Sequence, residues 1–258
     1  ELYYFALSFF VYGFLGWCTE VAYAAAKQGK FVNRGFLNGP ICPVYGIGVG
    51  VVVQFLTPVE NNLVLLYISS TILVTVIEGI TGFLLEKIFH NKWWDYSEQP
   101  LNIGGYVCVL FSLIWGVFCV LIVKIIHPLI YKVLTMIPLV LGIAVMACLA
   151  VGLLADLYVT ASGILKMNRR LEAMEKIAAE LKELSDKVGE NIYENVMEGM
   201  EFREEKKARI EELKAKYEEM AENRTKVGER LVKAFPKMQV GQHKEIFEEL
   251  RERIKRSK

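Results

Sequence analysis

Three acidic residues lie inside long apolar stretches of this sequence: Glu20, Glu78 and Asp156. A carboxylate at the depth of a lipid bilayer is costly, and it usually faces the interior of a helix bundle or a watery cavity. Such a group can relay a proton or a cation, act as a catalytic acid or base, or make a structural bond between helices. Small residues beside Glu20 and Glu78 predict that both face neighbouring helices, whereas Asp156 and Glu86 are weaker candidates for a site.

The densest polar chemistry lies in residues 33–45, which read Asn-Arg-Gly-Phe-Leu-Asn-Gly-Pro-Ile-Cys-Pro-Val-Tyr. Pro40 and Pro43 suit the first turn of a helix, and the two glycines permit backbone conformations that other residues resist. A broken or re-entrant start of a membrane helix, which attracts anions, explains this pattern. An ordinary cytoplasmic loop followed by a helix explains it equally well. The side chains expected to line a polar substrate site here are those of Glu20, Asn33, Arg34, Asn38, Tyr45 and Glu78.

A second polar stretch covers residues 87–106 and contains Lys-Trp-Trp-Asp-Tyr-Ser. Trp and Tyr beside a cation commonly anchor a chain at the level of the lipid headgroups, which accounts for the aromatic residues. It does not account for Asp95 and Asn102, which we expect to belong to the same substrate site and either to bond back into the bundle or to meet Arg34. No spacing of His and Cys typical of a metal site is present, and His127 resembles an ordinary interface residue. The sequence therefore predicts a substrate site without a metal, a cofactor or an assigned catalytic residue.

Composition divides the chain into an apolar part and a charged part. Residues 1–165 hold 7 of the 30 Lys and Arg residues and 8 of the 29 Asp and Glu residues. A helix needs about 20 apolar residues to cross a bilayer, and the second of five apolar stretches falls short of that length. We predict an all-α protein, with a transmembrane bundle at 1–165 and a cytoplasmic coiled-coil-like domain at 166–258. The predicted spans are 2–26, 43–56, 63–85, 106–126 and 137–165.

Basic residues predict the orientation of this bundle, because the side richer in Lys and Arg stays cytoplasmic. With five spans, eight basic residues between Lys27 and Arg170 fall on one side, against Lys124 and Lys132 on the other. The amino terminus is then outside and the charged tail is cytoplasmic. Omitting the short second span would separate Lys27 from Arg170, so the charge pattern favours five spans.

The tail carries two apolar stripes of coiled-coil type that are out of phase with each other. A break or hairpin between about residues 195 and 205 follows, and one long helix ending at Pro236 remains an alternative. A last amphipathic helix at 242–255 is able to pack on the coil, bind a partner or touch anionic lipid. Nearly balanced charge argues against nucleic-acid binding, because a nucleic-acid footprint is clearly basic. The coil also allows a homo-oligomer.

Several uncommon motifs occur together in residues 8–150: the stretch 33–45, the run Lys92 to Ser97, the Glu78 helix, and the pairs Trp115-Gly116 and His127-Pro128. In these motifs the chain resembles bacterial membrane proteins of the type IV ABC transporter permease family. The resemblance does not cover the tail after Leu165. It implies a polytopic bacterial membrane protein that forms the membrane part of an ABC system. The sequence has no phosphate-binding Gly-x-x-x-x-Gly-Lys-[Ser/Thr] motif, so the resemblance implies a separate ATPase subunit.

Three functions are consistent with these features. A permease-like role in membrane lipid, built on Glu20, Glu78 and Arg34, follows from buried acids beside broken backbone. A membrane-anchored scaffold or sensor would instead act through the cytoplasmic coil. An enzyme acting on a lipid-linked substrate, with Glu20 or Asp95 as acid or base, has the least support, because no Ser-His-Asp arrangement or metal cluster accompanies them.

Overall fold

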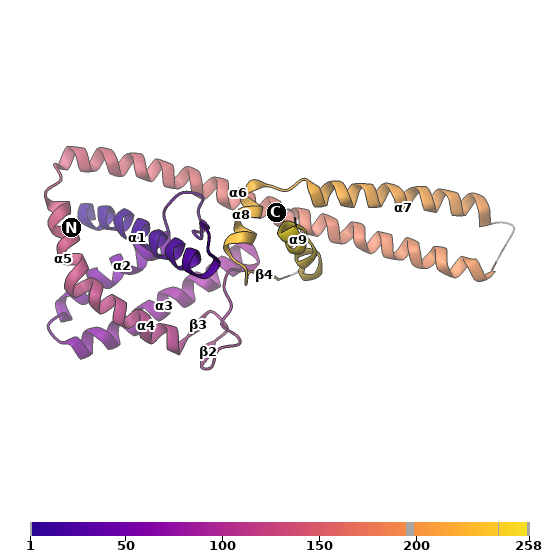
Figure 1. Ribbon diagram of the computed structural model, residues 1–258. Coiled ribbons are helices and arrows are strands. Elements are labelled where there is room, and N and C mark those ends of the chain that lie inside the picture. Colours follow the sequence, from indigo (N-terminus) through magenta and orange to yellow (C-terminus); the bar gives the residue numbers. More distant parts are fainter. Residues whose placement is uncertain (1, 195–198, 242, 257–258) are drawn as a thin grey trace. The chain divides into compact units, whose positions relative to one another are not determined.

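The computed structural model describes residues 2–194, 199–241 and 243–256, and these residues are predominantly helical (Figure 1). This confirms the all-α prediction. The helices that form the apolar part are α1 (Leu2–Gln28), α2 (Pro43–Leu56), the short η1 (Thr57–Val59), α3 (Leu63–Phe89), α4 (Val109–Leu121), the π-helical η2 (Ile122–Ile126), α5 (His127–Thr135) and α6 (Leu139–Glu194).

Four helical segments are long and apolar enough to cross a bilayer. They are Leu2–Gln28, Leu63–Phe89, Val109–Thr135 and the first part of Leu139–Lys187, and the shorter apolar segment Pro43–Val59 accompanies them. Large apolar side chains on α3, α4 and α6 are exposed, as expected of helices that face lipid. The chain is therefore a multi-pass membrane protein.

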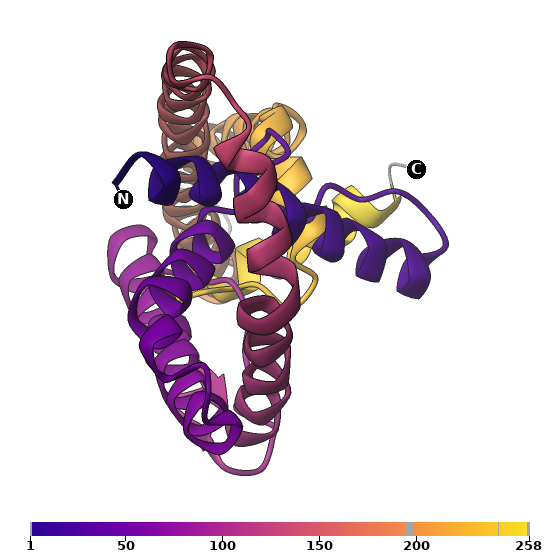
Figure 2. The same ribbon diagram turned by 90° about the vertical axis from the view of Figure 1, so that its left-hand side faces the viewer.

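Helix α2 coincides with the predicted second span 43–56, but it is not among the four segments long enough to cross a bilayer, because its 14 residues reach only about 21 Å at 1.5 Å per residue. Pro43 lies in its first turn, where the missing N–H costs nothing. The helix contacts both α1 and α3, and α3 contacts α4, as Figure 2 shows from the end of the bundle. A buried apolar cluster joins them, formed by Val52, Leu56, Leu66, Cys119 and Val123.

The fourth predicted span continues past its predicted end at Ile126. Helix α5 follows η2 directly and runs on to Thr135, so that α4, η2 and α5 form one apolar segment. Pro128 lacks a backbone N–H and cannot complete the regular helical ladder. The π-helical turn immediately before it widens the helix at the point where that bond is missing.

Four two-residue strands occur among the described residues: β1 (Asn91–Lys92), β2 (Asn102–Ile103), β3 (Val107–Cys108) and β4 (Gln239–Val240). Strands β2 and β3 pair antiparallel, with Asn102 opposite Cys108 and Ile103 opposite Val107. Gly104 and Gly105 turn the chain between them with φ of 60° and 72°. Glycine adopts this left-handed conformation without strain.

The chain forms two compact units. The first ends at Ala161 but also includes Arg230–Gln239, a segment of the charged tail. The second contains Ser162–Glu229 and the residues from Val240 onward. The division of the chain into domains at residue 165 stays a prediction.

The second unit contains the later part of α6 together with α7 (Gly199–Glu222) and α9 (Lys244–Arg256), while α8 (Lys226–Ala234) leads into the Arg230–Gln239 segment. Helix α7 returns beside α6 (Figure 1), and Arg209 of α7 pairs with Glu180 of α6 at 3.1 Å. The predicted break at 195–205 lies partly at residues 195–198, outside the described residues. Helix α9 contacts α7, where Tyr217 donates a hydrogen bond to Glu249 at 2.5 Å.

Candidate functional site

Glu20, Arg34 and Tyr45 meet within the first unit. Arg34 Nε lies 3.0 Å from Glu20 Oε2, and the Tyr45 hydroxyl donates to Glu20 Oε1 at 2.6 Å. The Arg34 and Glu20 side chains are 29% and 26% exposed, so the ion pair is neither fully enclosed nor freely hydrated. Three of the predicted site residues, from α1, the following loop and α2, are thus brought together.

Close packing of α1 and α2 places Tyr45 beside Glu20. Gly16 lies one helical turn before Glu20, and a Cβ atom there would come within 2.3 Å of Tyr45 Cγ. Only glycine leaves room for the tyrosine ring at this crossing. The guanidinium of Arg34 lies over the Tyr23 ring, 5.0 Å from its centre, which adds a cation–π contact on the other side.

Glu78 of α3 has a different partner. The Tyr96 hydroxyl donates to Glu78 Oε1 at 3.3 Å, and Tyr96 stacks on Phe111 of α4 with ring centres 5.1 Å apart. The second oxygen, Glu78 Oε2, is enclosed and has no hydrogen-bond partner among the described residues. An enclosed acceptor without a donor is costly, so a proton or a cationic ligand would stabilise this oxygen. Glu86 Oε2, two turns later on α3, shares this property among the described residues.

The charges of Glu20 and Arg34 act electrostatically on Tyr96, the partner of Glu78. Burial raises the pKa of the Tyr96 hydroxyl, and the negative charges of Glu78 and Glu20 raise it further, while Arg34 opposes them. Tyr96 therefore stays protonated and acts as a hydrogen-bond donor. On α4, Trp115 packs edge-on against Tyr45 at 5.7 Å between ring centres.

The loop from Asn33 to Gly39 is held by Asp156 of α6. Asp156 Oδ1 accepts from the Asn38 backbone N–H at 3.1 Å and from its side-chain Nδ2 at 2.8 Å, and Oδ2 accepts from Gly39 N at 2.6 Å. Thr160, one turn later on α6, accepts from Asn38 Nδ2 at 3.0 Å. Asp156 thus satisfies backbone donors of a non-helical segment, which is a structural role.

Asn33 shapes the same loop from its other end. Its Oδ1 accepts from Trp17 Nε1 at 2.8 Å and from the backbone N–H of Gly35 at 3.1 Å. Its Nδ2 donates to the Asn38 carbonyl at 2.7 Å. Asn33 and Asn38 therefore use their side chains on the loop itself, beside Arg34.

Arg230 of α8 binds this loop from the tail. Its Nη1 donates to the Gly35 carbonyl at 2.7 Å, and its Nη2 donates to the Phe36 carbonyl at 2.8 Å. Its Nε donates to Asn38 Oδ1 at 3.0 Å. Nothing in the tail sequence distinguishes Arg230 from its many basic neighbours, so sequence reasoning missed it.

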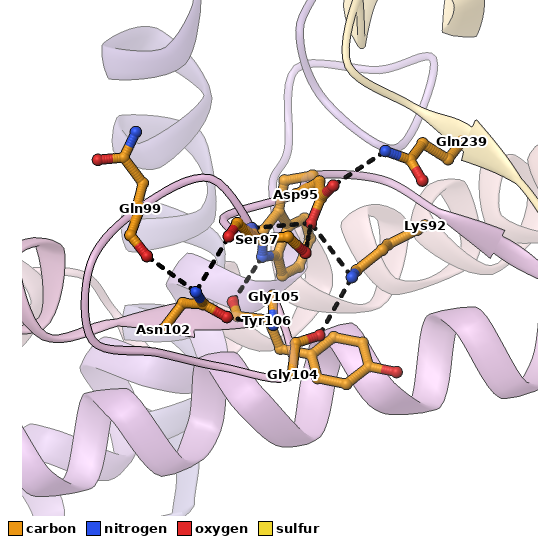
Figure 3. Close-up of polar contacts among 10 residues, drawn as sticks. Lys92, Asp95, Ser97, Gln99, Asn102, Gly104, Gly105, Tyr106 and Gln239 are labelled. Carbon is orange, nitrogen blue, oxygen red and sulfur yellow. Dashed lines mark hydrogen bonds and ion pairs between the residues drawn. The ribbon is translucent and has the colours of Figure 1, made fainter.

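Asp95 and Asn102 lie in the second loop (Figure 3). Asp95 Oδ1 accepts from Ser97 Oγ at 2.5 Å and lies 3.2 Å from Lys92 Nζ, while Oδ2 accepts from Gln239 Nε2 at 2.9 Å. Partial burial of Asp95 would raise its pKa, but the bonds from Ser97 and Lys92 lower the pKa to about 2. The contact with Arg34 that the sequence allowed is not among these partners.

Asn102 connects the two ends of the second loop. Its Nδ2 donates to the Gln99 carbonyl at 2.8 Å, and its Oδ1 accepts from Gly105 N at 3.1 Å (Figure 3). A Cβ atom at Gly105 would come within 2.6 Å of Lys92 Nζ, Ser97 Oγ and Asp95 Oδ1. Glycine is therefore required for the loop to close around the Lys92–Asp95 pair.

The arrangement combines the Arg34–Glu20 ion pair, the hydroxyl donors of Tyr45 and Tyr96, and the Glu78 carboxylate, whose second oxygen has no partner within the described ranges. Among the described residues, no group of three or more His, Cys, Asp or Glu side chains is placed to hold a metal ion. Sequence reasoning identified Glu20, Arg34, Tyr45 and Glu78 but missed Tyr96. The headgroup-anchor interpretation accounted for Tyr96 as one aromatic among several, although its position beside Asp95 was a polar signal.

A family model described as "Putative ABC-transporter type IV" matches residues 7–161, more than half of the chain. The matched residues contain Glu20, Arg34, Tyr45, Glu78 and Tyr96, and they do not include Arg230. No curated protein and no solved structure matches the chain.

Proposed function

From the premise that this chain belongs to the type IV ABC transporter family, we propose that it moves a polar substrate through its membrane unit, using Glu20, Arg34, Tyr45 and Glu78. The observation that carries the proposal is the pair of carboxylates on α1 and α3, of which Glu78 keeps an enclosed oxygen that accepts from no donor in the described part of the chain. A structural ion pair alone leaves no such oxygen. In the loops, Asn33, Asn38, Asp95 and Asn102 border this site and shape its backbone.

The ion pair between Arg34 and Glu20 is able to break and re-form as a substrate binds and leaves. A polar substrate group can replace either partner, because exposure of about a quarter of each side chain leaves both within reach of water. Tyr45 would keep Glu20 in place during the exchange, since its hydroxyl donates to the other carboxylate oxygen.

The proposed orientation places the amino terminus outside and the tail in the cytoplasm. Supporting it, the loop after α1 contacts the α6 residues Asp156 and Thr160, and Phe36 packs against Trp93 in the loop after α3. Basic residues gather in these loops, as the positive-inside rule requires of a cytoplasmic face. Reporter fusions in the loop 57–62 and at the carboxyl end would test this, and activity of both reporters on the same side would contradict it.

Energy for transport would come from an ATPase outside these 258 residues, because the sequence has no phosphate-binding loop of the Walker type. Co-purification of the tagged full chain from its native host, followed by mass spectrometry, tests this proposal. An ATP-binding subunit enriched over an unrelated membrane protein supports it. Its absence after mild cross-linking contradicts it.

The transport experiment compares Glu20→Gln and Glu78→Gln with the matched surface variant Glu98→Gln. Cells lacking the native gene receive each variant, and untargeted mass spectrometry measures which small molecules accumulate inside and outside. We expect the two site variants to reproduce the deletion profile at normal protein levels, while the Glu98 variant behaves as wild type. Wild-type profiles from both site variants would contradict the proposal.

A scaffold or sensor role is the second candidate, favoured by the tail residues after 161 that lie outside the family match. Helices α6 and α7 present many charged side chains there, including exposed ion pairs such as Lys176 with Glu172. A scaffold would lose a bound protein when the α6–α7 hairpin is shortened, whereas a transporter would keep its substrate profile. Mass spectrometry of the co-purified proteins tests the first outcome, and mass spectrometry of the small molecules tests the second.

A further inference from the structure

Arg230 differs from the other tail arginines in what it binds. Arg209 and Arg253 pair with exposed glutamates, whereas Arg230 donates three hydrogen bonds to the loop between α1 and α2. Burial lowers the pKa of its guanidinium, and the nearby charge of Asp156 opposes that shift. Arg230 is half-buried, so its guanidinium loses part of its hydration, and the three acceptors of the loop replace the water that it loses.

Asn38 joins two half-buried charges, the guanidinium of Arg230 and the carboxylate of Asp156. Its Oδ1 accepts from Arg230, and its Nδ2 donates to Asp156. The amide has only one orientation that works, because a guanidinium can only donate and a carboxylate can only accept. Asn38 therefore transmits the position of Arg230 to α6 through a single rigid side chain.

Both peptide groups of Gly35 are held by side chains from other parts of the loop and the tail. Its N–H donates to Asn33 Oδ1, and its carbonyl accepts from Arg230 Nη1. Glycine has the widest choice of backbone conformations, so these two bonds determine the direction in which the chain leaves it. Arg34 is the residue immediately before Gly35.

We propose that Arg230 is a positioning residue of the polar site, because it holds the Gly35 and Phe36 carbonyls and thereby directs Arg34 onto Glu20. Arg230 then determines the geometry of the Arg34–Glu20 ion pair without contacting either side chain. The consequence for transport rests on the function proposed above, but the positioning is a property of the loop and is measurable without a substrate.

Arg230→Lys is the decisive variant. Lysine keeps the charge, but its single ammonium group cannot reproduce the planar fork that reaches three acceptors. Arg209→Lys is the matched control, since Arg209 is an exposed tail arginine that pairs only with glutamates. Both variants are made in the full chain and placed in lipid nanodiscs.

The first readout is fluorine NMR of protein labelled with 5-fluorotryptophan. Trp17 bonds Asn33 and reports the loop, whereas Trp94 bonds the Tyr106 carbonyl and serves as an internal reference. We expect Arg230→Lys to shift or broaden the Trp17 resonance and to leave Trp94 unchanged, while Arg209→Lys changes neither. An unchanged Trp17 resonance in Arg230→Lys would overturn the proposal.

The second readout is the coupling between Arg34 and Glu20, measured by a double-mutant cycle of melting temperatures with Arg34→Gln and Glu20→Gln. The cycle is run with Arg230 intact and again with Arg230→Lys. Positioning predicts that the coupling falls to less than half of its original value. A residue that only adds stability would lower all melting temperatures and preserve the coupling, which would also overturn the proposal.

If Arg230→Lys does not fold, Asn38→Ala removes one of the three acceptors and is tested in the same two ways. Failure of the two proposals is distinguishable. Loss of transport in Glu20→Gln with unchanged Trp17 and coupling in Arg230→Lys refutes positioning alone. Changed Trp17 and coupling, with normal transport in Glu20→Gln and Glu78→Gln, refutes the transport function and leaves positioning standing.

Discussion

Asp156 illustrates how one acidic side chain on a membrane helix is accommodated. Both carboxylate oxygens accept from Asn38 and Gly39, so the charge is matched by donors from a segment that has no helical partners. Glu78 lacks such a match, because one of its oxygens has no donor among the described residues. A carboxylate therefore binds loop backbone donors at Asp156 on α6, whereas at Glu78 on α3 one oxygen remains able to accept from a substrate.

Replacement of Asp156 by Asn should destabilise the first unit. An amide cannot accept through both positions, so the Asn38 or Gly39 N–H faces another donor, at a cost of about 2–3 kcal/mol. Thr160→Val removes a neutral partner of Asn38 and should cost about 1 kcal/mol. Melting temperatures of the two variants in nanodiscs check the ranking, which an equal loss would contradict.

The Arg34–Glu20 pair should show measurable coupling in the wild-type background. The two charges lie 3.0 Å apart and are partly shielded from water, so we expect a coupling of about 1 kcal/mol from a double-mutant cycle. Lys27→Gln and Glu98→Gln supply an exposed reference pair, for which the coupling should be near zero. A coupling no larger than that of the reference would show that the pair is loosely held.

At the scale of elements, the loop 91–106 depends on backbone conformation as much as on charge. Gly105 combines a φ of 72° with contacts that leave no room for a side chain, whereas Gly29 has a φ of 68° and open space around it. A substitution at Gly29 therefore tests backbone strain alone, whereas one at Gly105 tests backbone strain together with side-chain crowding.

Gly29→Ala should lower the free energy of unfolding by about 1–2 kcal/mol, because alanine is strained in the left-handed conformation that glycine adopts freely. Gly105→Ala should lose the same stability from backbone strain. It should also separate Lys92 from Asp95, so its melting temperature should be clearly lower than that of Gly29→Ala. Thermal unfolding of both variants in the same nanodisc preparation makes the comparison. Equal melting temperatures would mean that the Lys92–Asp95 pair adjusts freely.

Elements differed in how far the sequence predicted them. The long apolar helices followed from length and composition, and the bounds of the helix at 43–56 were predicted as well. Whether this helix spans a membrane stays a prediction, because 14 apolar residues suit a buried helix as well as a short span. Only the tertiary structure identified the neighbours of this helix: Tyr45 packs against Gly16, and a buried cluster forms around Val52. Extension of the fourth segment past Pro128 also escaped prediction, because the π-helical turn that tolerates the proline has no sequence signature.

For the whole molecule, the segment Arg230–Gln239 belongs to the first unit although it lies far along the charged tail. Phe235 packs edge-on against Trp93 at 5.2 Å between ring centres, and Gln239 bonds Asp95. Removing the complete tail after residue 170 therefore removes part of the membrane unit and is a poor test of a tail function.

Deletion of 171–258 should lower the melting temperature of the first unit and open the loop 33–41 to proteolysis. Deletion of 184–205, with Glu183 joined to Lys206 by a short Gly-Ser linker, should change neither property. The linker is short because Glu180 pairs with Arg209, which places Glu183 and Lys206 at the same level of the hairpin. Equal stability of the two deletions would refute a contribution of Arg230–Gln239.

The sequence by itself determined the membrane class, the long apolar helices, the family and the acidic residues worth testing, since these depend on composition and on local spacing. Only the tertiary structure decided which partner each acid takes: Arg34 and Tyr45 for Glu20, Tyr96 for Glu78, and the loop backbone for Asp156. It also placed Arg230 against Gly35, 195 residues away along the chain. Pairing over such separations depends on helix packing and on the directions of side chains, and neither is encoded in a local pattern.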